Sequence, residues 1–156
     1  MRQMNDNMNG HPSDSTIQQN AEIELLQTLS QKLGYDLHPH TIRLNNKSAI
    51  QIDGFSATGR ILCEVYAHVG TLRGSQSDKV AADILKLNLA ATRLGGPWHK
   101  VLLFADEVAC KQLRGSSWLS EACKESGVGI MVADMSGKMK GKIAEAQRKQ
   151  KMVNVR

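Results

Sequence analysis

The chain of 156 residues is long enough for one domain of ordinary size. No apolar run reaches the length of a membrane helix, and the polar start lacks the apolar block of a secretory signal, so we expect a cytoplasmic protein. A net charge of +5 fits a polyanionic partner, whereas an aromatic content of 4% leaves little material for a base-stacking surface. The three cysteines are odd in number and have no histidine at metal-ligand spacing, which disfavours a disulfide framework and a zinc site.

The first part of the chain predicts a flexible tail followed by a helix. Residues 1–18 carry almost no apolar side chains and cannot bury enough surface to order themselves. Residues 21–33 predict a helix that ends at Gly34, because four leucines recur at helical spacing: Leu25, Leu26, Leu29 and Leu33. Glu22 points along the same apolar stripe, so this helix presents one carboxylate toward the core.

The middle of the chain predicts a meander of three strands, and the second half predicts strands that alternate with helices. The three strands are expected at 41–44, 48–52 and 60–67, separated by the turn-forming "NNK" and "GFSATG". A helix over 76–92, the strand "KVLLFA", a helix over 117–126 and the strand "GIMVAD" follow. We therefore expect an α/β domain over 19–136, a three-layer α/β/α sandwich around a mixed sheet with the order α-β-β-β-α-β-α-β.

The C-terminal segment 137–156 is rich in lysine and arginine, with Glu145 as its single acid. It is expected either to lie along phosphates, through Lys138, Lys140 and Lys142, or to form a solvated basic tail.

Two acidic residues interrupt apolar strands in the stretch "IQIDGFSATGRILCEVYAHVG". Asp53 follows Ile52 at the end of the second predicted strand, and Glu64 lies in the middle of the third. Buried carboxylates are costly unless they are compensated, and two that meet repel each other. A shared Mg²⁺ or Mn²⁺ ion would remove that cost. The alternatives are that Asp53 and Gly54 form only a turn, and that Glu64 pairs with Arg60 or Arg43.

The residues "IDGFSATGRILCEVYAH", together with the order of elements from Glu22 to about residue 134, resemble the PD-(D/E)XK nuclease superfamily, which has the restriction-endonuclease-like fold. In that family an Asp, often followed by Gly, precedes a Glu-x-Lys on the next strand. The resemblance implies that Asp53 and Glu64 bind the metal and that Glu22 matches an acid some members place on the first helix. Tyr66 stands where the family has its lysine.

The resemblance also implies where a replacement lysine could come from. Some members carry it on the following helix, and in "GSQSDKVAADILK" the candidate is Lys79, which could equally be a surface residue paired with Asp83. Gln76 resembles the helix Gln of RecB-like members, and Arg73 is placed to hold flanking phosphates. The implied activity is metal-assisted hydrolysis of phosphodiester bonds in DNA, with Asp53, Glu64 and Lys79 as catalytic residues.

Two other readings remain open. A nuclease-fold protein without catalysis could bind DNA or another protein as a subunit or regulator, and Tyr66 supports that reading. A Rossmann-like domain is disfavoured, because no glycine-rich phosphate loop follows the first strand. A homodimer would be compatible with either nuclease-fold reading.

Overall fold

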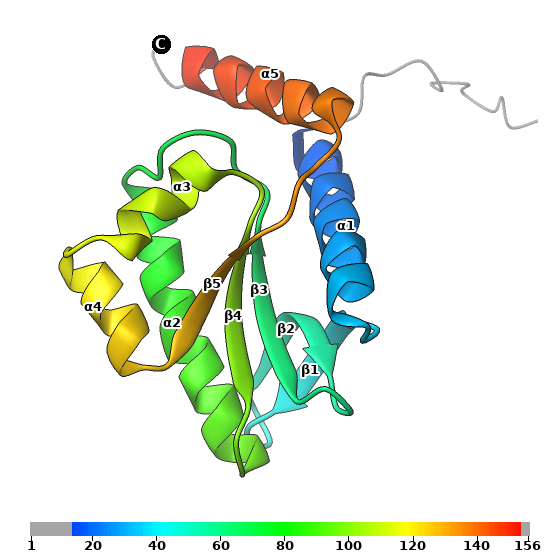
Figure 1. Cartoon of the computed structure of the whole chain (residues 1–156), viewed down its shortest axis with the longest axis vertical. Helices are drawn as coiled ribbons and strands as arrows, with labels where there is room; N and C mark the ends of the chain where they lie inside the picture. Colours follow the sequence, from blue (N-terminus) through cyan, green and yellow to red (C-terminus); the bar gives the residue numbers. More distant parts are fainter. Residues whose placement is uncertain (1–13, 154–156) are drawn as a thin grey trace, which may run out of the picture.

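Five strands form one open sheet, in the order β1-β2-β3-β4-β5, with helices on both faces (Figure 1). The computed structural model describes residues 14–153. The strands are β1 (His38–Arg43), β2 (Ala49–Ser56), β3 (Ile61–Tyr66), β4 (His99–Phe104) and β5 (Val128–Val132). β1, β2 and β3 pair antiparallel, whereas β3, β4 and β5 pair parallel. The predicted α/β sandwich with a mixed sheet is confirmed.

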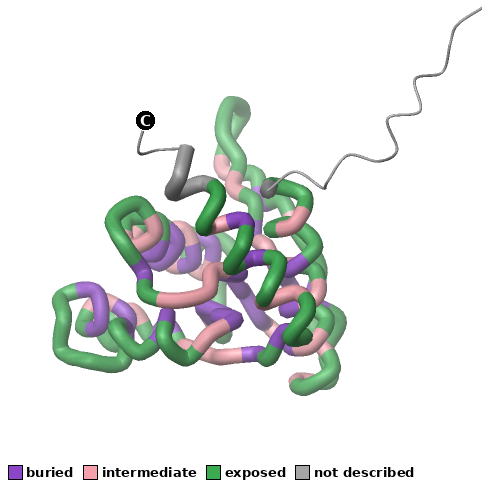
Figure 2. Tube along the Cα trace, turned by 90° about the horizontal axis from the view of Figure 1, so that it is seen from above, coloured by how far each residue is buried: buried purple, intermediate pink, exposed green. Residues whose placement is uncertain are grey.

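Each face of the sheet has its own apolar core. Helices α1 (Asp14–Leu33) and α5 (Gly137–Val153) contribute to one core, together with the β3 residues Ile61, Cys63 and Val65. The opposite core is formed with α2 (Ser75–Leu94), α3 (Glu107–Lys111), a 3₁₀ turn (Gln112–Arg114) and α4 (Trp118–Glu125). Figure 2 shows buried positions gathered between these layers and exposed positions on their outer sides. All six residues of β3 are buried, because both faces of this central strand are covered.

Both ends of the described chain differ from the sequence prediction. Helix α1 begins at Asp14, so residues 14–18 are helical rather than part of a tail, and residues 1–13 lie outside the described part. The basic segment forms α5, and Ile143 and Ala146 on that helix are buried in the core that it shares with α1. Apolar residues at helical spacing thus make this segment a packed helix. No helix between residues 14 and 153 combines the length and apolar character needed to cross a bilayer.

Strand β2 continues past its predicted end and contains a bulge at the first of the two acids. His40 pairs with Ile52 and His38 pairs with Phe55, so β2 carries one extra residue between these pairs, at Asp53 and Gly54. Pro39 lies opposite the extra residue and has no N–H to donate to the ladder, which makes this edge a favourable place for a bulge. The expectation that Asp53 and Gly54 form only a turn is therefore wrong.

Gly54 allows β2 to approach α1 closely. A Cβ atom at this position would lie 2.5 Å from Leu26 Cδ1 and 3.3 Å from Cys63 Cβ. The glycine that follows Asp53 thus lets β2 pack closely against α1, and a larger residue would have to displace the end of the Leu26 side chain.

We predict that Gly54→Ala lowers the free energy of unfolding by about 1–3 kcal/mol, because the added methyl group overpacks this contact. Urea denaturation measures the change. Leu26→Ala removes the atoms that clash but has its own cost as a core leucine, so Gly54→Ala should cost less in a Leu26→Ala background than in the parent. Gly129→Ala in β5 is the control, because its Cβ would meet only ordinary contacts, with Lys100 O at 3.7 Å. Equal losses at Gly54 and Gly129 would contradict the proposed contact.

Candidate functional site

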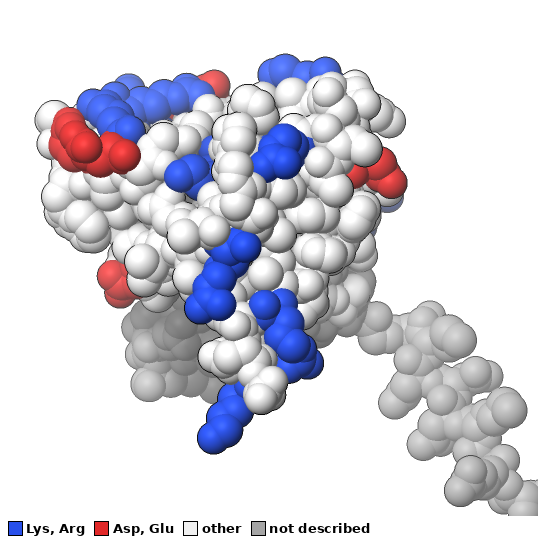
Figure 3. Space-filling model, turned by 90° about the horizontal axis from the view of Figure 1, so that it is seen from below, with Lys and Arg blue, Asp and Glu red and all other residues white. Residues whose placement is uncertain are grey.

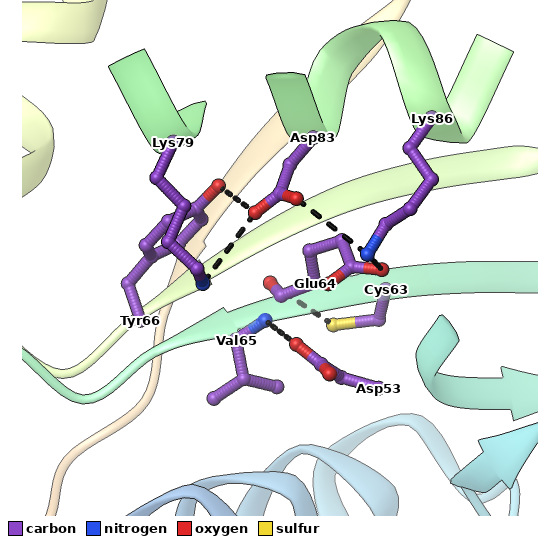
Figure 4. Close-up of polar contacts among 8 residues, drawn as sticks. All are labelled: Asp53, Cys63, Glu64, Val65, Tyr66, Lys79, Asp83 and Lys86. Carbon is purple, nitrogen blue, oxygen red and sulfur yellow. Dashed lines mark hydrogen bonds and ion pairs between the residues drawn. The ribbon is translucent and has the colours of Figure 1, made fainter. Parts of the chain in front are cut away.

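Glu64 is a carboxylate in the middle of the central strand, with an exposed fraction of only 1%. It shares the α2 face of β3 with Leu62 and Tyr66, as the alternation of a strand requires. The Lys86 Nζ atom on α2 lies 2.9 Å from Glu64 Oε1 (Figure 4). This Oε1 atom nevertheless accepts no hydrogen bond of good geometry among the described residues. Glu64 is thus a buried carboxyl group whose neighbouring positive charge is Lys86.

Asp53 lies beside Glu64 at the point where β2 separates from β3. Ladder pairing between these strands runs only from Ser56 to Gly54, so the backbone of β3 loses its β2 partner beyond Cys63. The Asp53 Oδ2 atom accepts a hydrogen bond from the Val65 N–H at 3.0 Å and replaces that partner. The bulge therefore gives the Asp53 side chain a fixed position on β3.

The neighbouring carboxyl group of Asp53 changes how readily Glu64 gives up its proton. Burial raises the pKa of Glu64 most, and a hydrogen bond with Asp53 and the charge of Asp53 raise it further. Lys86 opposes these effects, and the result is a Glu64 pKa of about 9. Although the Lys86 contact by itself favours the ionised form, burial and the second carboxyl outweigh it. Near pH 7 Glu64 therefore keeps its proton in the metal-free protein.

Glu22 brings a third carboxyl group to this region from α1. Its side chain is half-buried, and burial and the charge of Asp53 raise its pKa, while the charge of Lys79 lowers it. Within residues 14–153, however, no three His, Cys, Asp or Glu side chains lie close enough together to form a metal-ligand cluster. Glu22 thus lies near enough to Asp53 for the Asp53 charge to raise its pKa, but it does not complete a ligand cluster.

Tyr66, at the position where the resemblance implies a lysine, is hydrogen-bonded to α2. Its hydroxyl donates a hydrogen bond to Asp83 Oδ2 at 2.5 Å (Figure 4). Burial, and then the charge of Asp83, raise the pKa of Tyr66 well above its ordinary value, so the phenol stays neutral. Tyr66 therefore provides a hydrogen-bond donor to Asp83 and no positive charge.

Two lysines of α2 supply positive charge at this site, one of which the sequence reasoning missed. Lys79 Nζ lies 3.6 Å from Asp83 Oδ2 and 4.6 Å from the centre of the Tyr66 ring. The expected surface pair with Asp83 is thus present, and the charge of Lys79 also reaches Glu22. Lys86 makes the contact with Glu64 and lies 3.6 Å from Asp83 Oδ1. The spacing of 79, 83 and 86 along one helix face is the signal that could have identified it.

The arginines expected to pair with Glu64 are not its partners. Arg60 donates hydrogen bonds to the backbone oxygens of Pro97 and Gly95, and its guanidinium lies over the Trp98 ring. Lys86 takes the role that was considered for Arg60 and Arg43, because α2 covers the face of β3 to which Glu64 points.

The remaining candidates lie beside the acid pair rather than in it. Gln76, one turn before Lys79, accepts a hydrogen bond from the Arg73 backbone N–H, and its Nε2 atom lies 3.3 Å from His68 Nδ1. The Arg73 side chain is exposed. The three candidate lysines of α5 occupy the first two turns of that helix, with Lys138 and Lys142 exposed and Lys140 half-buried.

The acid pair has the chemistry needed to hold a hard divalent cation. Mg²⁺ is commonly bound in proteins through one or two carboxylates, with waters and phosphate oxygens completing its coordination. Asp53 and Glu64 supply two carboxyl groups from neighbouring strands, which is the donor type that Mg²⁺ or Mn²⁺ prefers. Binding of such a cation would require Glu64 to release the proton that it holds near pH 7.

The raised pKa of Glu64 predicts how stability changes with pH. The folded protein keeps a proton that the unfolded chain releases above pH 4.5, so the contribution of Glu64 falls as pH rises toward about 9. In the metal-free protein, Glu64→Gln should therefore show a smaller loss of unfolding free energy between about pH 5 and 9 than the parent. Chemical denaturation at fixed pH measures this, and Glu121→Gln on exposed α4 is the control. Parallel curves for the parent and Glu64→Gln would refute the shift.

Comparison with known proteins does not assign this chain to a family. No family model, no curated protein and no solved structure matches it. The function is therefore inferred from the residues and their geometry.

Proposed function

We propose that this protein is a metal-dependent nuclease that hydrolyses phosphodiester bonds in DNA with Mg²⁺ or Mn²⁺. One observation carries the proposal: the carboxyl groups of Asp53 and Glu64 are brought together at the point where β2 separates from β3. Burying two carboxyl groups side by side lowers the stability of the fold, and a divalent cation bound between them would remove that cost.

The order of elements supports the same proposal. A helix that carries Glu22, three antiparallel strands, and then helices alternating with parallel strands are what the resemblance to PD-(D/E)XK nucleases implies. The acids also occupy the implied elements, with Asp53 on β2 and Glu64 on β3. The order is thus consistent from Glu22 to the end of β5.

Each residue of the site has a distinct role in this proposal. Asp53 and Glu64 would hold the cation, and Glu22 would add negative charge on the side of α1. When bound, the cation would supply an activated water and would neutralise charge that develops on the phosphate. Lys79, about half exposed beside Tyr66, is placed to contact the attacking water or the phosphate. Lys86 positions Glu64 and offsets its charge when the proton leaves.

A second function is favoured by one contact. Lys86 Nζ already supplies a positive charge 2.9 Å from Glu64, and Tyr66 replaces the family lysine. The alternative is therefore a nuclease-fold subunit that binds nucleic acid or protein without cutting. An activity measurement separates the two functions.

We predict that the protein nicks supercoiled plasmid, or cuts branched DNA, single-stranded DNA or RNA, when Mg²⁺ or Mn²⁺ is present. Asp53→Asn and Glu64→Gln should each lower the rate about 100-fold or more, and a chelator should abolish it, because the cation is lost. Gel assays with the purified full chain measure the rate. Glu121→Gln is the matched acid control, since this exposed residue pairs only with Lys124 on α4. If Asp53→Asn cuts as well as the parent, the site is wrong, and if the parent cuts none of these substrates, the non-catalytic function is favoured.

The two lysines should have separable effects. Lys79→Met should lower the cleavage rate about 10- to 100-fold with little change in stability, because its side chain is 51% exposed. Lys86→Met should lower the unfolding free energy by about 1–3 kcal/mol, because it removes the ammonium group that contacts the buried carboxyl groups of Glu64 and Asp83. Cleavage kinetics and urea denaturation of both variants test this, with exposed Lys124→Met as the control. Unchanged cleavage by Lys79→Met would remove it from the catalytic set.

A further inference from the structure

A hollow of about 610 Å³ lies between the loop that follows β3 and helix α5. Residues 68–71 and 73–76 form one wall, and Ala144, Gln147 and Arg148 of α5 form the other. None of the residues that line this hollow is acidic, and two of them, Arg73 and Arg148, are arginines. We call it the arginine hollow, and its lining suits an anionic ligand.

The arginine hollow adjoins the candidate active site. A smaller cavity of about 110 Å³ shares His68, Gln76 and Gln147 with it. This cavity continues to Tyr66 and Lys79, the two residues that lie beside the acid pair. An extended ligand could thus occupy both the hollow and the site.

The charges of the two arginines are available to a ligand. Arg148 pairs with Glu145 at 3.4 Å, but both side chains are largely exposed, and such pairs are weak and easily exchanged. No hydrogen bond or ion pair of the Arg73 side chain to another residue within 14–153 is found. The nearby carboxylate of Asp106 already accepts hydrogen bonds from the backbone N–H groups of Gly70 and Val108.

A two-point contact fixes the two walls of the hollow relative to each other. The Gln147 side chain donates to the Val69 carbonyl at 2.9 Å and accepts from the Val69 N–H at 3.0 Å. This contact joins α5 to the loop and places Arg148 on the wall facing Arg73. A site whose walls are already fixed loses less freedom when a ligand binds.

We infer that the arginine hollow binds a backbone phosphate of the polynucleotide next to the phosphate held at the acid pair, with Arg73 and Arg148 as its ligands. The inference rests on the proposed function and adds a second contact point for the substrate. It also changes which α5 residues are expected to touch nucleic acid, because Lys138, Lys140 and Lys142 do not line the hollow. Arginine is well suited to this contact, since its planar group binds phosphate through two hydrogen bonds.

Binding without cleavage tests the inference. Fluorescence anisotropy with a labelled single-stranded oligonucleotide and its duplex is measured in the Asp53→Asn chain with chelator present. Arg73→Gln with Arg148→Gln should weaken binding about tenfold or more and lower the slope of log affinity against log salt by about one to two. The double variant should keep the thermal stability of its parent, because both side chains are exposed.

The control must remove the same amount of charge elsewhere. Lysine and arginine side chains are also spread over the end of the molecule opposite α5 (Figure 3), so positive charge alone does not mark a site. Lys32→Gln with Lys47→Gln, both exposed, is the matched control and should change affinity much less. Equal weakening by the two pairs, or no binding by the parent chain, would overturn the inference. If the unsubstituted chain cuts no substrate but the two pairs of variants still differ in binding as expected, only the nuclease proposal is overturned.

Discussion

The contact between two carboxyl groups at the separation of β2 and β3 is the constraint on which the rest of this structure depends. Glu64 is buried because β3 is the central strand, and Asp53 is directed toward it because β2 bulges and leaves the Val65 N–H without a strand partner. Such a pair is unfavourable unless a proton, a lysine or a metal ion balances it. The bulge in β2 directs Asp53 toward β3, and Gly54 lets β2 pack closely against α1. Helix α2 contributes the positive charge of Lys86 beside Glu64.

Helix α2 provides that balance with residues on one of its faces. Lys86 places its ammonium group beside Glu64. Asp83 forms ion pairs with both Lys79 and Lys86 and accepts a hydrogen bond from the Tyr66 hydroxyl. Lys79 lies at the exposed end of this network. The site thus has a buried side, where charge is fixed, and an open side toward the arginine hollow. A buried side that carries the carboxyl groups and an open side that carries Lys79 and the two arginines are what the proposed binding of an anionic polymer beside a cation requires.

The sequence predicted the five strands and the helices α1, α2 and α4 in their order, and it placed Asp53 and Glu64 on neighbouring strands, because strand alternation and the spacing of apolar residues are local signals. It did not predict the helices α3 and α5. It did not reveal Lys86 as the partner of Glu64, since that contact depends on how α2 crosses β3. The end of β2 was misplaced because Asp53 and Gly54 look like turn residues, whereas a bulge opposite Pro39 carries the strand through them. The segment that forms α5 reads as a basic tail, because only Ile143 and Ala146 mark its buried side clearly.

The central claim is that Asp53 and Glu64 together bind a divalent cation, and titration with Mn²⁺ followed by amide NMR tests it most directly. Mn²⁺ is paramagnetic and broadens the signals of nearby nuclei, and the Val65 N–H is bonded to Asp53 itself. The account predicts that the Val65 and Glu64 amide signals broaden first in the parent and remain sharp in Asp53→Asn at the same Mn²⁺ concentration. Broadening that is absent from these residues, or that persists unchanged in Asp53→Asn, would contradict it.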